Sequence, residues 1–327
     1  IGLSIDADRI PVWGRKDIRL ADDPSAGDWL VFYQSGRRSM FTYAAQLRED
    51  PIKDSDVGEW IWGGDYEYIY PLESLTPIDI DSGWLQREVR GYGRDHVQGM
   101  ECLGEGSCQG RYRLRYLYHS AAEFVAAHAH PEFESLREQL RTDGQVVMYG
   151  PPGTGKTYTA KHFADWWYAI SPDRCSADEM LESTTFHPAY SYEDFIEGLT
   201  ANATSNGVSY DHEPGVFKSI VERIEGNTQN PGSRVPPYLL LVDEINRGNL
   251  PEILGELVTQ LEWDKRGGQP GAVPANLAHS AESGFTVPSN LYLIGTMNTA
   301  DQSIALIDAA IRRRFGFIQC NPDIAFA

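Results

Sequence analysis

Residues 150–157 have the types and spacing that could hold a chain of phosphate groups. They read GPPGTGKT, fit the phosphate-loop pattern GxxxxGK[ST] at every specified position, and follow an apolar run at residues 146–148. Backbone N–H groups can wrap polyphosphate only where side chains do not intrude, which explains the glycines. We therefore predict that the whole run binds nucleotide: Gly150, Pro151, Pro152, Gly153, Thr154, Gly155, Lys156 and Thr157.

Two side chains of this run have distinct chemical roles. Lys156 supplies a positive charge for the β and γ phosphates, and Thr157 supplies a hydroxyl for Mg²⁺. Residues 158–170 carry apolar side chains at helical spacing, so the loop would open onto a helix N-terminus, whose dipole favours anions. A Gly/Pro turn that matches by chance is the alternative, and the flanking strand and helix patterns argue against it.

A pair of carboxylates, Asp243 and Glu244, follows the apolar run at residues 238–242, which predicts a strand buried on both faces. Burying such acids without partners is costly, so we expect them to be used. Asp243 would hold Mg²⁺, directly or through water, and Glu244 would orient or deprotonate an attacking water. An apolar pattern at residues 250–261, after Asn249, indicates a helix next.

A third apolar run, residues 291–294, leads into GTMNTADQS at 295–303 and IALIDAAIRRRF at 304–315. Together with the phosphate loop and DEINRGNL at 243–250, these motifs resemble, in this order, an AAA+ module of the McrB type. That family comprises the GTP-hydrolysing motor subunits of modification-dependent restriction systems. FHPAYSYEDFIEGL at 186–199 also resembles a segment between the two nucleotide motifs of the family.

The resemblance implies roles for four further residues. Asn298 resembles the sensor that polarises the attacking water, and Asp301 resembles the residue through which the ring senses its nuclease partner. Arg313 and Arg314 resemble residues that reach into the neighbouring subunit's site, where an arginine can be worth about 10³ to 10⁵ in rate. A solvated, positively charged helix end is the alternative interpretation of these arginines.

The choice of nucleotide rests on the resemblance alone. The sequence has no clear NKxD guanine-reading motif, and NTAD at 298–301 has Thr where Lys belongs. GTP is therefore the implied substrate, ATP stays open, and Mg²⁺ is the expected cofactor. Gln302 stands where the family usually has Arg, which leaves the role of that guanidinium, such as a subunit contact, open.

The 327 residues, of which 41% are hydrophobic, favour two domains. Residues 1–118 are rich in Trp, Tyr and Gly and carry short alternating runs, which predicts a β-rich barrel. Residues 119–141 predict a helical connector interrupted by Pro131, and residues 142–327 an α/β nucleotide-hydrolysing core with a parallel sheet between helices. Because the chain ends soon after the arginines, we expect this core to stop before a helical lid.

The N-terminal domain resembles the EVE, PUA-like and YTH-like barrels, which read modified bases. The resemblance rests on VWG at 12–14, GDWLVFY at 27–33 and EWIWGGDYEYIYPL at 59–72. Such barrels take a flipped base into an aromatic pocket. The candidate pocket walls are Trp13, Trp60, Trp62 and Tyr33. Burial of the same rings in a barrel core is an equally open alternative.

A net charge of −19 and a pI of about 4.8 conflict with simple nucleic-acid binding, which relies on Lys and Arg. Two explanations remain open. A local basic groove would gather the arginines at 87, 90, 94, 111, 113 and 115; alternatively, the acidity is solvation in a high-salt cytoplasm. Only six of the 28 basic residues are Lys, which agrees with the second explanation.

The four cysteines form no CxxC pair, so reduced thiols are expected rather than a zinc site. The sequence contains no apolar run long enough for a membrane and no signal peptide, so we expect a cytoplasmic protein without a membrane partner.

These features predict a GTPase of the AAA+ class that is the motor subunit of a restriction system for methylated DNA. Its N-terminal domain would read a flipped modified base, cytosine or adenine, in double-stranded DNA. A homo-oligomeric ring, a hexamer by family resemblance, would activate a McrC-type nuclease, because no nuclease constellation occurs here. The alternatives are an AAA+ ATPase that remodels proteins or RNA–protein partners with the barrel as adaptor, and a switch that hydrolyses nucleotide only to disassemble.

Overall fold

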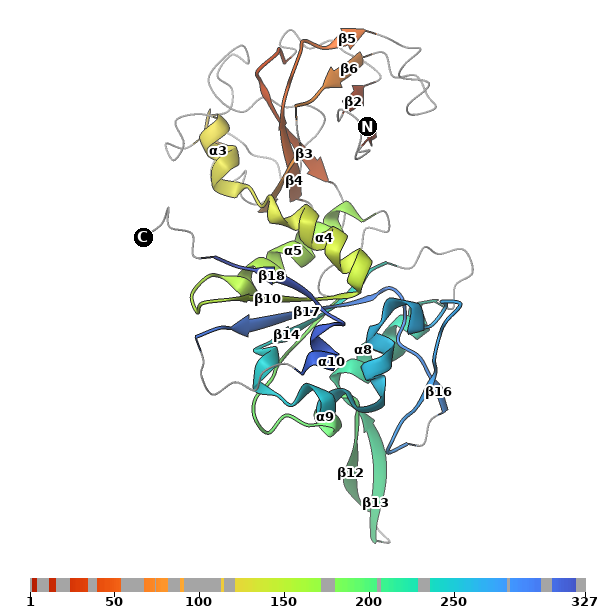
Figure 1. The fold of residues 1–327 in the computed structure, drawn as a ribbon. Helices are drawn as coiled ribbons and strands as arrows, with labels where there is room; N and C mark the ends of the chain where they lie inside the picture. The colour runs from red at the N-terminus through yellow and green to blue at the C-terminus, as the bar shows by residue number, and fades with distance from the viewer. Residues whose placement is uncertain are drawn as a thin grey trace. The chain divides into compact units, whose positions relative to one another are not determined.

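A computed structural model of the chain shows two compact units, Ile1–Phe133 and Glu134–Ala327 (Figure 1). The predicted boundaries at residues 118 and 141 stay a prediction. The structure describes residues 2–4, 12–15, 24–34, 40–53, 68–73, 75–81, 89–90, 113–114, 121–171, 180–204, 207–228, 236–280, 283–300 and 308–321.

The N-terminal unit is built from antiparallel sheets, as its alternating runs predict. A four-stranded sheet has the order β1 (Gly2–Ser4), β2 (Val12–Arg15), β6 (Tyr68–Pro71), β5 (Ile52–Lys53). A three-stranded sheet has the order β3 (Trp29–Gln34), β4 (Met40–Gln46), β7 (Thr76–Asp81), and β8 (Val89–Arg90) pairs with β9 (Arg113–Leu114). Closure of these sheets into a barrel stays a prediction.

One apolar core joins the two larger sheets of this unit. Leu47, directly after β4, forms an isolated antiparallel bridge with Leu72, directly after β6. Both side chains are buried, and the cluster continues through Leu30 and Tyr70. Because each sheet contributes to it, this cluster is an apolar contact between them.

Two helices, α3 (Ala121–His128) and α4 (Glu132–Asp143), occupy the segment predicted as a helical connector. The break between them falls at the predicted position, around Pro131, whose ring cannot continue a helix. Ala129 bridges Ile78, and the His130 amide donates to the Pro77 carbonyl at 2.8 Å. The stretch after α3 is therefore anchored to β7 of the N-terminal unit.

The C-terminal unit contains a five-stranded sheet in which every pairing is parallel, which confirms the α/β prediction. Its order is β11 (Leu181–Thr185), β14 (Tyr238–Asp243), β17 (Leu291–Asn298), β10 (Gln145–Gly150), β18 (Gly316–Gln319). The first five residues of β14 are all buried, as expected for a strand covered on both faces. The carboxyl ends of β10, β14 and β17 therefore meet at one edge.

Helices and a hairpin surround this sheet. Helix α5 (Lys156–Ile170) contacts β10, β14 and β17, and α8 (Val216–Thr228) contacts β11 and β14. In Figure 1 the two helices lie on opposite sides of the sheet. The other elements are α7 (Tyr192–Phe195), hairpin β12 (Glu197–Thr204) and β13 (Gly207–Pro214), η1 (Ile245–Arg247), α9 (Leu250–Leu254), η2 (Gly255–Leu261), η3 (Trp263–Lys265), β15 (Ala275–Asn276), β16 (Ser283–Phe285) and α10 (Ala309–Arg312).

The helix predicted after Asn249 differs in one respect. The α-helix ends at Leu254, and 3₁₀ geometry continues to Leu261. The cause is Gly255, which has φ +50°, and the Tyr192 ring lies 3.0 Å from the position that a Cβ would take there. The apolar pattern still faces the core, because Ile253 and Leu261 are buried.

Across the residues that the structure describes, no helix is both long and apolar enough to cross a bilayer.

Candidate nucleotide site

The phosphate-loop residues connect β10 to α5, as predicted, and the loop surface is open. Gly153 and Gly155 have φ +83° and +73°, a region that side chains other than glycine rarely adopt. A Cβ at either position would have nothing within 4 Å in the described structure. Because α5 begins directly after Gly155, free N–H groups of its first turn are available to an anion. The loop therefore fits a polyphosphate.

Lys156 is turned back onto its own loop. Its ammonium donates to the Gly150 carbonyl at 3.1 Å, to the Pro151 carbonyl at 2.7 Å and to Thr154 Oγ1 at 3.2 Å. The residue is only 6% exposed, and these partners are all neutral oxygens. An anion adds the attraction between opposite charges to the hydrogen bond, which a neutral carbonyl or hydroxyl does not supply. A phosphate is therefore a better partner for this ammonium than the loop itself.

Gly150 is explained by packing rather than by space for phosphate. A Cβ at Gly150 would lie 2.2 Å from the carbonyl oxygen of Cys320, at the end of β18. The Cys320 amide donates to the Tyr149 carbonyl at 2.7 Å, which holds the two backbones together. The reason for a glycine at this first motif position is therefore the neighbouring strand.

The two predicted magnesium residues come together at the carboxyl edge of the sheet. Thr157 Oγ1, in the first turn of α5, donates to Asp243 Oδ1, at the end of β14, over 2.7 Å. The hydroxyl of Thr296, on β17, donates to the same carboxylate oxygen. A carboxylate and hydroxyls are hard oxygen donors of the kind that Mg²⁺ takes, so the residues present fit that ion.

Thr296 is a site residue that the sequence analysis missed. Its hydroxyl donates to Asp243 and accepts the Glu244 backbone N–H at 3.2 Å, so one group contacts both acids of the motif. It is 3% exposed. Its position two residues before Asn298 on a buried strand was the available indication, because alternate residues of a strand share a face.

Glu244 has an unusual backbone. With φ 54° and ψ 43° it is the one non-glycine residue of positive φ in the described part of the chain. Such a conformation costs on the order of 1–3 kcal/mol and clusters at functional sites. The Asn298 amide donates to Glu244 Oε1. Oε2 is buried without a hydrogen bond, although Arg247 Nε lies 3.4 Å away at ion-pair range.

The predicted interface arginines lie in two different environments. Arg314 is held within its own unit: Nη2 lies 2.8 Å from Glu262 Oε1, Nη1 donates to the Ala310 carbonyl at 2.7 Å, and the side chain is 9% exposed. Arg313, the residue after α10, is exposed. The Arg312 guanidinium lies 5.6 Å from the centre of the Phe317 ring. Arg313 and Arg314 therefore differ in their surroundings: the first is exposed, and the second is paired within its own unit.

For the remaining predicted residues the site stays a prediction. Asp301, Trp60 and Trp62 lie outside the described residues. Trp13 is on β2, opposite Leu3 and Tyr70 in register, whereas Tyr33 is on β3 of the other sheet. The Tyr33 ring lies 5.2 Å from that of Phe41, and its hydroxyl is buried without a hydrogen-bond partner among the described groups.

The glycine loop before α5, the acids at the end of β14 and the parallel sheet define a phosphate-loop nucleoside triphosphatase. Residues 145–315, about half of the chain, match the AAA domain family of the dynein-related subfamily. The chain belongs to that family, and with it to the AAA+ nucleoside triphosphatases, which use nucleotide and Mg²⁺.

Two proteins of restriction systems are similar to this chain in sequence. The EcoKMcrB subunit of a type IV methyl-directed restriction enzyme of Escherichia coli is 37% identical over 189 residues, which cover 58% of this chain and 38% of that protein. Component YdiS of the type II restriction enzyme BsuMI of Bacillus subtilis is 26% identical over 217 residues, 57% and 59% of the two chains. The McrB-type resemblance of the motifs is confirmed. The chain spans less than two thirds of either relative.

Among solved structures, the chain aligns with a putative ATPase from Cytophaga hutchinsonii with a TM-score of 0.35, 17% identity and coverage of 57% of this chain and 44% of that one. A DNA polymerase III gamma subunit-related protein of Thermotoga maritima has a TM-score of 0.32, 9% identity and coverage of 60% and 47%.

Proposed function

We propose that the chain is the GTP-hydrolysing motor subunit of a restriction system for methylated DNA. One observation supports the hydrolytic part of this proposal: two acids lie beside the phosphate loop, each with a polar partner. Asp243 contacts Thr157, and Glu244 contacts Asn298. GTP rather than ATP rests on the resemblance to the McrB type. The restriction role is supported by the relatives, both of which are restriction-enzyme components.

The residues of the loop and of the sheet edge have separate tasks. Thr157 and Asp243 hold the metal ion, while Lys156 exchanges its loop carbonyls for phosphate oxygens. Bound Mg²⁺ neutralises phosphate charge and draws electrons from the transferred group. The Lys156 side chain is already buried beside the loop whose carbonyls it contacts.

Glu244 is proposed to orient the attacking water and to accept its proton. Asn298 donates to Oε1, and Oε2 has no hydrogen bond, so water is proposed to bind Oε2 beside Arg247, whose Nε lies 3.4 Å away. The left-handed backbone, fixed by the Thr296 hydroxyl, sends the Glu244 side chain towards Asn298 rather than along β14. Holding the base in place in this way contributes to rate because no reorganisation is needed at the moment of reaction.

Hydrolysis is proposed to depend on assembly into a homo-oligomeric ring, a hexamer. Arg313 is exposed and would enter the neighbouring subunit's site, where it would stabilise charge on the transferred phosphate. Arg314 is proposed to orient the end of α10 through its pair with Glu262. The two arginines that the sequence grouped together would thus act on different steps.

The N-terminal unit is proposed to read a flipped methylated base in double-stranded DNA with Trp13, Trp60, Trp62 and Tyr33. Asp301 is proposed to pass the state of the ring to a McrC-type nuclease. In the register of β8 and β9, Arg90 pairs with Arg113, and both belong to the run of arginines from which the sequence predicts a basic groove. The first relative is by its own name methyl-directed, which supports this substrate class.

A protein-remodelling ATPase is the second candidate, and one observation favours it. The net charge of −19 opposes DNA binding at low salt. In that case the N-terminal unit would bind protein or RNA–protein partners, and methylated duplex would leave the hydrolysis rate unchanged.

The test is steady-state hydrolysis of GTP and of ATP with plain duplex, with duplex carrying methylated cytosine and with duplex carrying methylated adenine. We expect GTP turnover that rises with one methylated duplex only. Lys156→Ala should lower it about 10²- to 10³-fold, because a preorganised charge is lost. Lys161→Ala, an exposed lysine on the same helix, is the matched control. Turnover of ATP alone, indifferent to DNA, would reject the proposal in favour of remodelling.

A further inference from the structure

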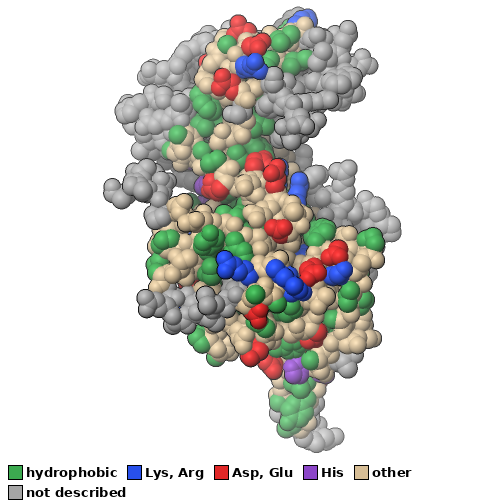
Figure 2. Space-filling model, viewed as in Figure 1, with side chains coloured by type: hydrophobic (Ala, Val, Ile, Leu, Met, Phe, Trp, Pro, Cys, Tyr) green, Lys and Arg blue, Asp and Glu red, His purple; other side chains and the backbone are tan. Residues whose placement is uncertain are grey.

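The β12–β13 hairpin has one apolar face that the described structure leaves open. Residues directly opposite in an antiparallel pair share a face, and the register places Leu199 opposite His212 and Ala201 opposite Tyr210. Val208, two residues before Tyr210, lies on the same face. The exposed fractions of Leu199, Val208 and Tyr210 are 53%, 62% and 68%. In Figure 2 hydrophobic side chains cover the visible side of this projecting hairpin.

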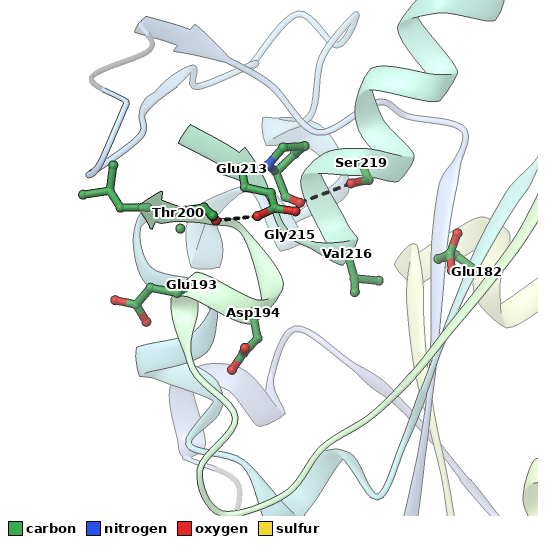
Figure 3. A pocket seen from close by; sticks show the side chains of 11 residues that line it. Glu182, Glu193, Asp194, Thr200, Glu213, Gly215, Val216 and Ser219 are labelled. Carbon is green, nitrogen blue, oxygen red and sulfur yellow. Dashed lines mark hydrogen bonds between the residues drawn. The ribbon is translucent and has the colours of Figure 1, made fainter. Parts of the chain in front are cut away.

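The opposite face of the hairpin is polar and acidic. Asp211 and Glu213 alternate with Tyr210 and His212 along β13, and residues 197–214 contain no Lys or Arg. At the base of the hairpin is a hollow of about 550 Å³ (Figure 3). Its charged lining consists of the carboxylates of Glu182, Glu193, Asp194 and Glu213. Arg223 pairs with Glu182 at 2.8 Å, so a net negative charge remains in the hollow.

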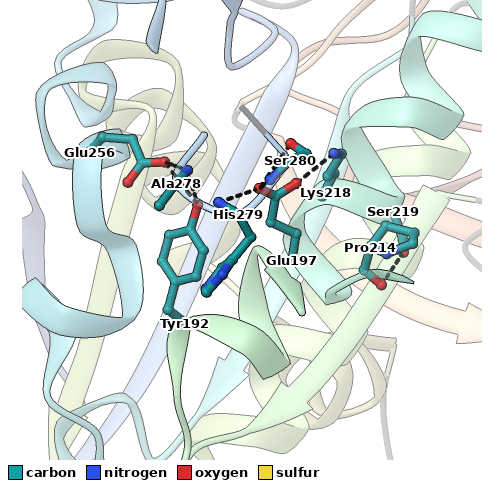
Figure 4. Close-up of polar contacts among 9 residues, drawn as sticks. All are labelled: Tyr192, Glu197, Pro214, Lys218, Ser219, Glu256, Ala278, His279 and Ser280. Atoms are coloured by element: carbon teal, nitrogen blue, oxygen red, sulfur yellow. Dashed lines mark hydrogen bonds and ion pairs between the residues drawn. The ribbon is translucent and has the colours of Figure 1, made fainter. Parts of the chain in front are cut away.

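The base of the hairpin is fixed by a buried polar cluster. Glu197, the first residue of β12, is fully buried, and its carboxylate lies 2.8 Å from Lys218 Nζ on α8. It also accepts the Ser280 hydroxyl at 2.9 Å and the backbone N–H groups of His279 and Ser280 at 3.1 and 2.7 Å (Figure 4). Burial alone would raise the pKa of Glu197, but these hydrogen bonds lower it to about 2. The hairpin is therefore held in one orientation, which reduces the ordering cost of binding.

Among the described strands β12 and β13 pair only with each other, so the outer edge of β13 has no strand beside it. An extended segment can pair with such an edge through main-chain hydrogen bonds, and its side chains then alternate between the two faces. Apolar side chains of the segment would extend the face of Val208 and Tyr210. Basic side chains would lie beside Asp211 and Glu213.

We propose that the outer edge of β13 binds an extended segment of a protein partner in which apolar and basic residues alternate. Charge complementarity selects this occupant. Duplex DNA is disfavoured because the hairpin carries acids and no Lys or Arg. Pairing of two copies of β13 is disfavoured because it would bring their acidic faces together. The surface lies apart from the nucleotide residues, so the proposal does not depend on hydrolysis.

The test uses the full 327-residue chain and fluorescence anisotropy of labelled peptides. The probe alternates leucine and lysine; one control replaces each lysine by glutamate, and another carries N-methyl groups at alternate backbone nitrogens. We expect binding of the first peptide only. The N-methyl peptide separates strand pairing from general adhesion, since it keeps the side chains but loses main-chain donors.

Two pairs of substitutions locate the binding. Val208→Thr with Tyr210→Thr should weaken it about tenfold or more, and Asp211→Asn with Glu213→Gln should weaken it and remove its salt dependence. Val273→Thr and Glu225→Gln, exposed residues of the same unit, are the matched controls and should bind as the parent does. Unchanged far-ultraviolet circular dichroism and an unchanged melting temperature would show that the hairpin variants are folded.

Equal binding of the glutamate peptide, or no loss in the hairpin variants, would overturn the proposal. Light scattering tests whether a second copy of the chain binds at this edge. If the chain self-associates and Val208→Thr with Tyr210→Thr abolishes that association, the surface binds another copy of the chain, and the proposal is overturned.

Discussion

Two buried polar clusters of the C-terminal unit, one around Glu197 and one around Glu244, use similar groups for different ends. At Glu197 the carboxylate faces a lysine, a hydroxyl and two backbone donors, and the backbone is ordinary strand. At Glu244 one carboxylate oxygen has no hydrogen bond, and the backbone is left-handed. Buried polar groups that are fully satisfied stabilise, while a strained, partly satisfied group indicates a place for substrate.

The comparison is tested most severely by Glu244→Gln. Because the amide cannot accept the proton of water, turnover should fall about 10²- to 10⁴-fold. The melting temperature should change little, since the substitution is isosteric, Asn298 can still donate to the remaining oxygen, and the lost ion pair is with Arg247, an exposed side chain. Steady-state hydrolysis and differential scanning calorimetry measure the two effects. A large fall in melting temperature with turnover retained would assign Glu244 a structural role.

Glu197→Ala should give the reverse result. Removing one partner of a buried ion pair costs about 3–5 kcal/mol, because Lys218 stays buried without its counter-charge. Turnover per folded molecule should stay near that of the parent. Chemical denaturation measures the free energy of unfolding, and Glu225→Gln, an exposed glutamate on α8, provides the control.

The pH dependence of stability sharpens the same prediction. The pKa of Glu197 is lowered to about 2, below its ordinary value of 4.5, so its stabilising contribution is complete above pH 4.5. That contribution is lost as the pH falls from about 4.5 towards 2, where the folded state must also take up the proton. Glu197→Gln should lack this component of acid unfolding. The same acid curve in parent and variant would contradict it.

Thr296→Val should have an intermediate effect. The valine keeps the shape but removes the hydroxyl that accepts the Glu244 N–H, so a buried donor loses its partner at a cost of about 1–3 kcal/mol. If this free-energy cost is expressed as a displacement of Glu244, turnover should drop about ten- to a hundredfold with little change in the Michaelis constant. Thr296→Ser should restore most of the rate. Loss in both variants would show that the methyl group, not the hydroxyl, matters.

The smallest expected effects separate the two arginines. Arg314→Ala should lower the free energy of unfolding by about 1–3 kcal/mol, because it breaks a hydrogen-bonded pair with Glu262 at a largely buried position. Arg313→Ala should leave stability unchanged and reduce turnover only at concentrations where subunits assemble. Arg312→Ala, an exposed neighbour, is the control for both. If Arg314→Ala and Arg313→Ala lowered the free energy of unfolding equally, the two arginines would not have the different roles proposed.

The nucleotide motifs were predictable because each lies in one short stretch beside a strongly apolar strand. The meeting of Thr157 with Asp243 followed from the parallel order of β10 and β14 around β17. Thr296 was not predicted, because its role depends on β17 lying next to β14. The Glu197 cluster was missed for the same reason: Lys218 and Ser280 lie 21 and 83 residues further along the chain.

The hairpin could have been found from the sequence. Asn206 and Gly207 stand between two short runs in which apolar and polar residues alternate, a strong local indication of a hairpin. The difference between Arg313 and Arg314 could not, because it depends on Glu262 reaching α10 from a segment about fifty residues earlier. Trp60, Trp62 and Asp301 stay predictions.

The phosphate loop and strand β18 are in direct backbone contact at Gly150 and Cys320. Between the two backbones there is no room for even a methyl group, so no side chain can absorb a displacement. The strand that begins four residues after α10 ends against the first residue of the phosphate loop. A displacement of this strand therefore has to be matched by a displacement at Gly150, because backbone rather than a side chain fills the space between them.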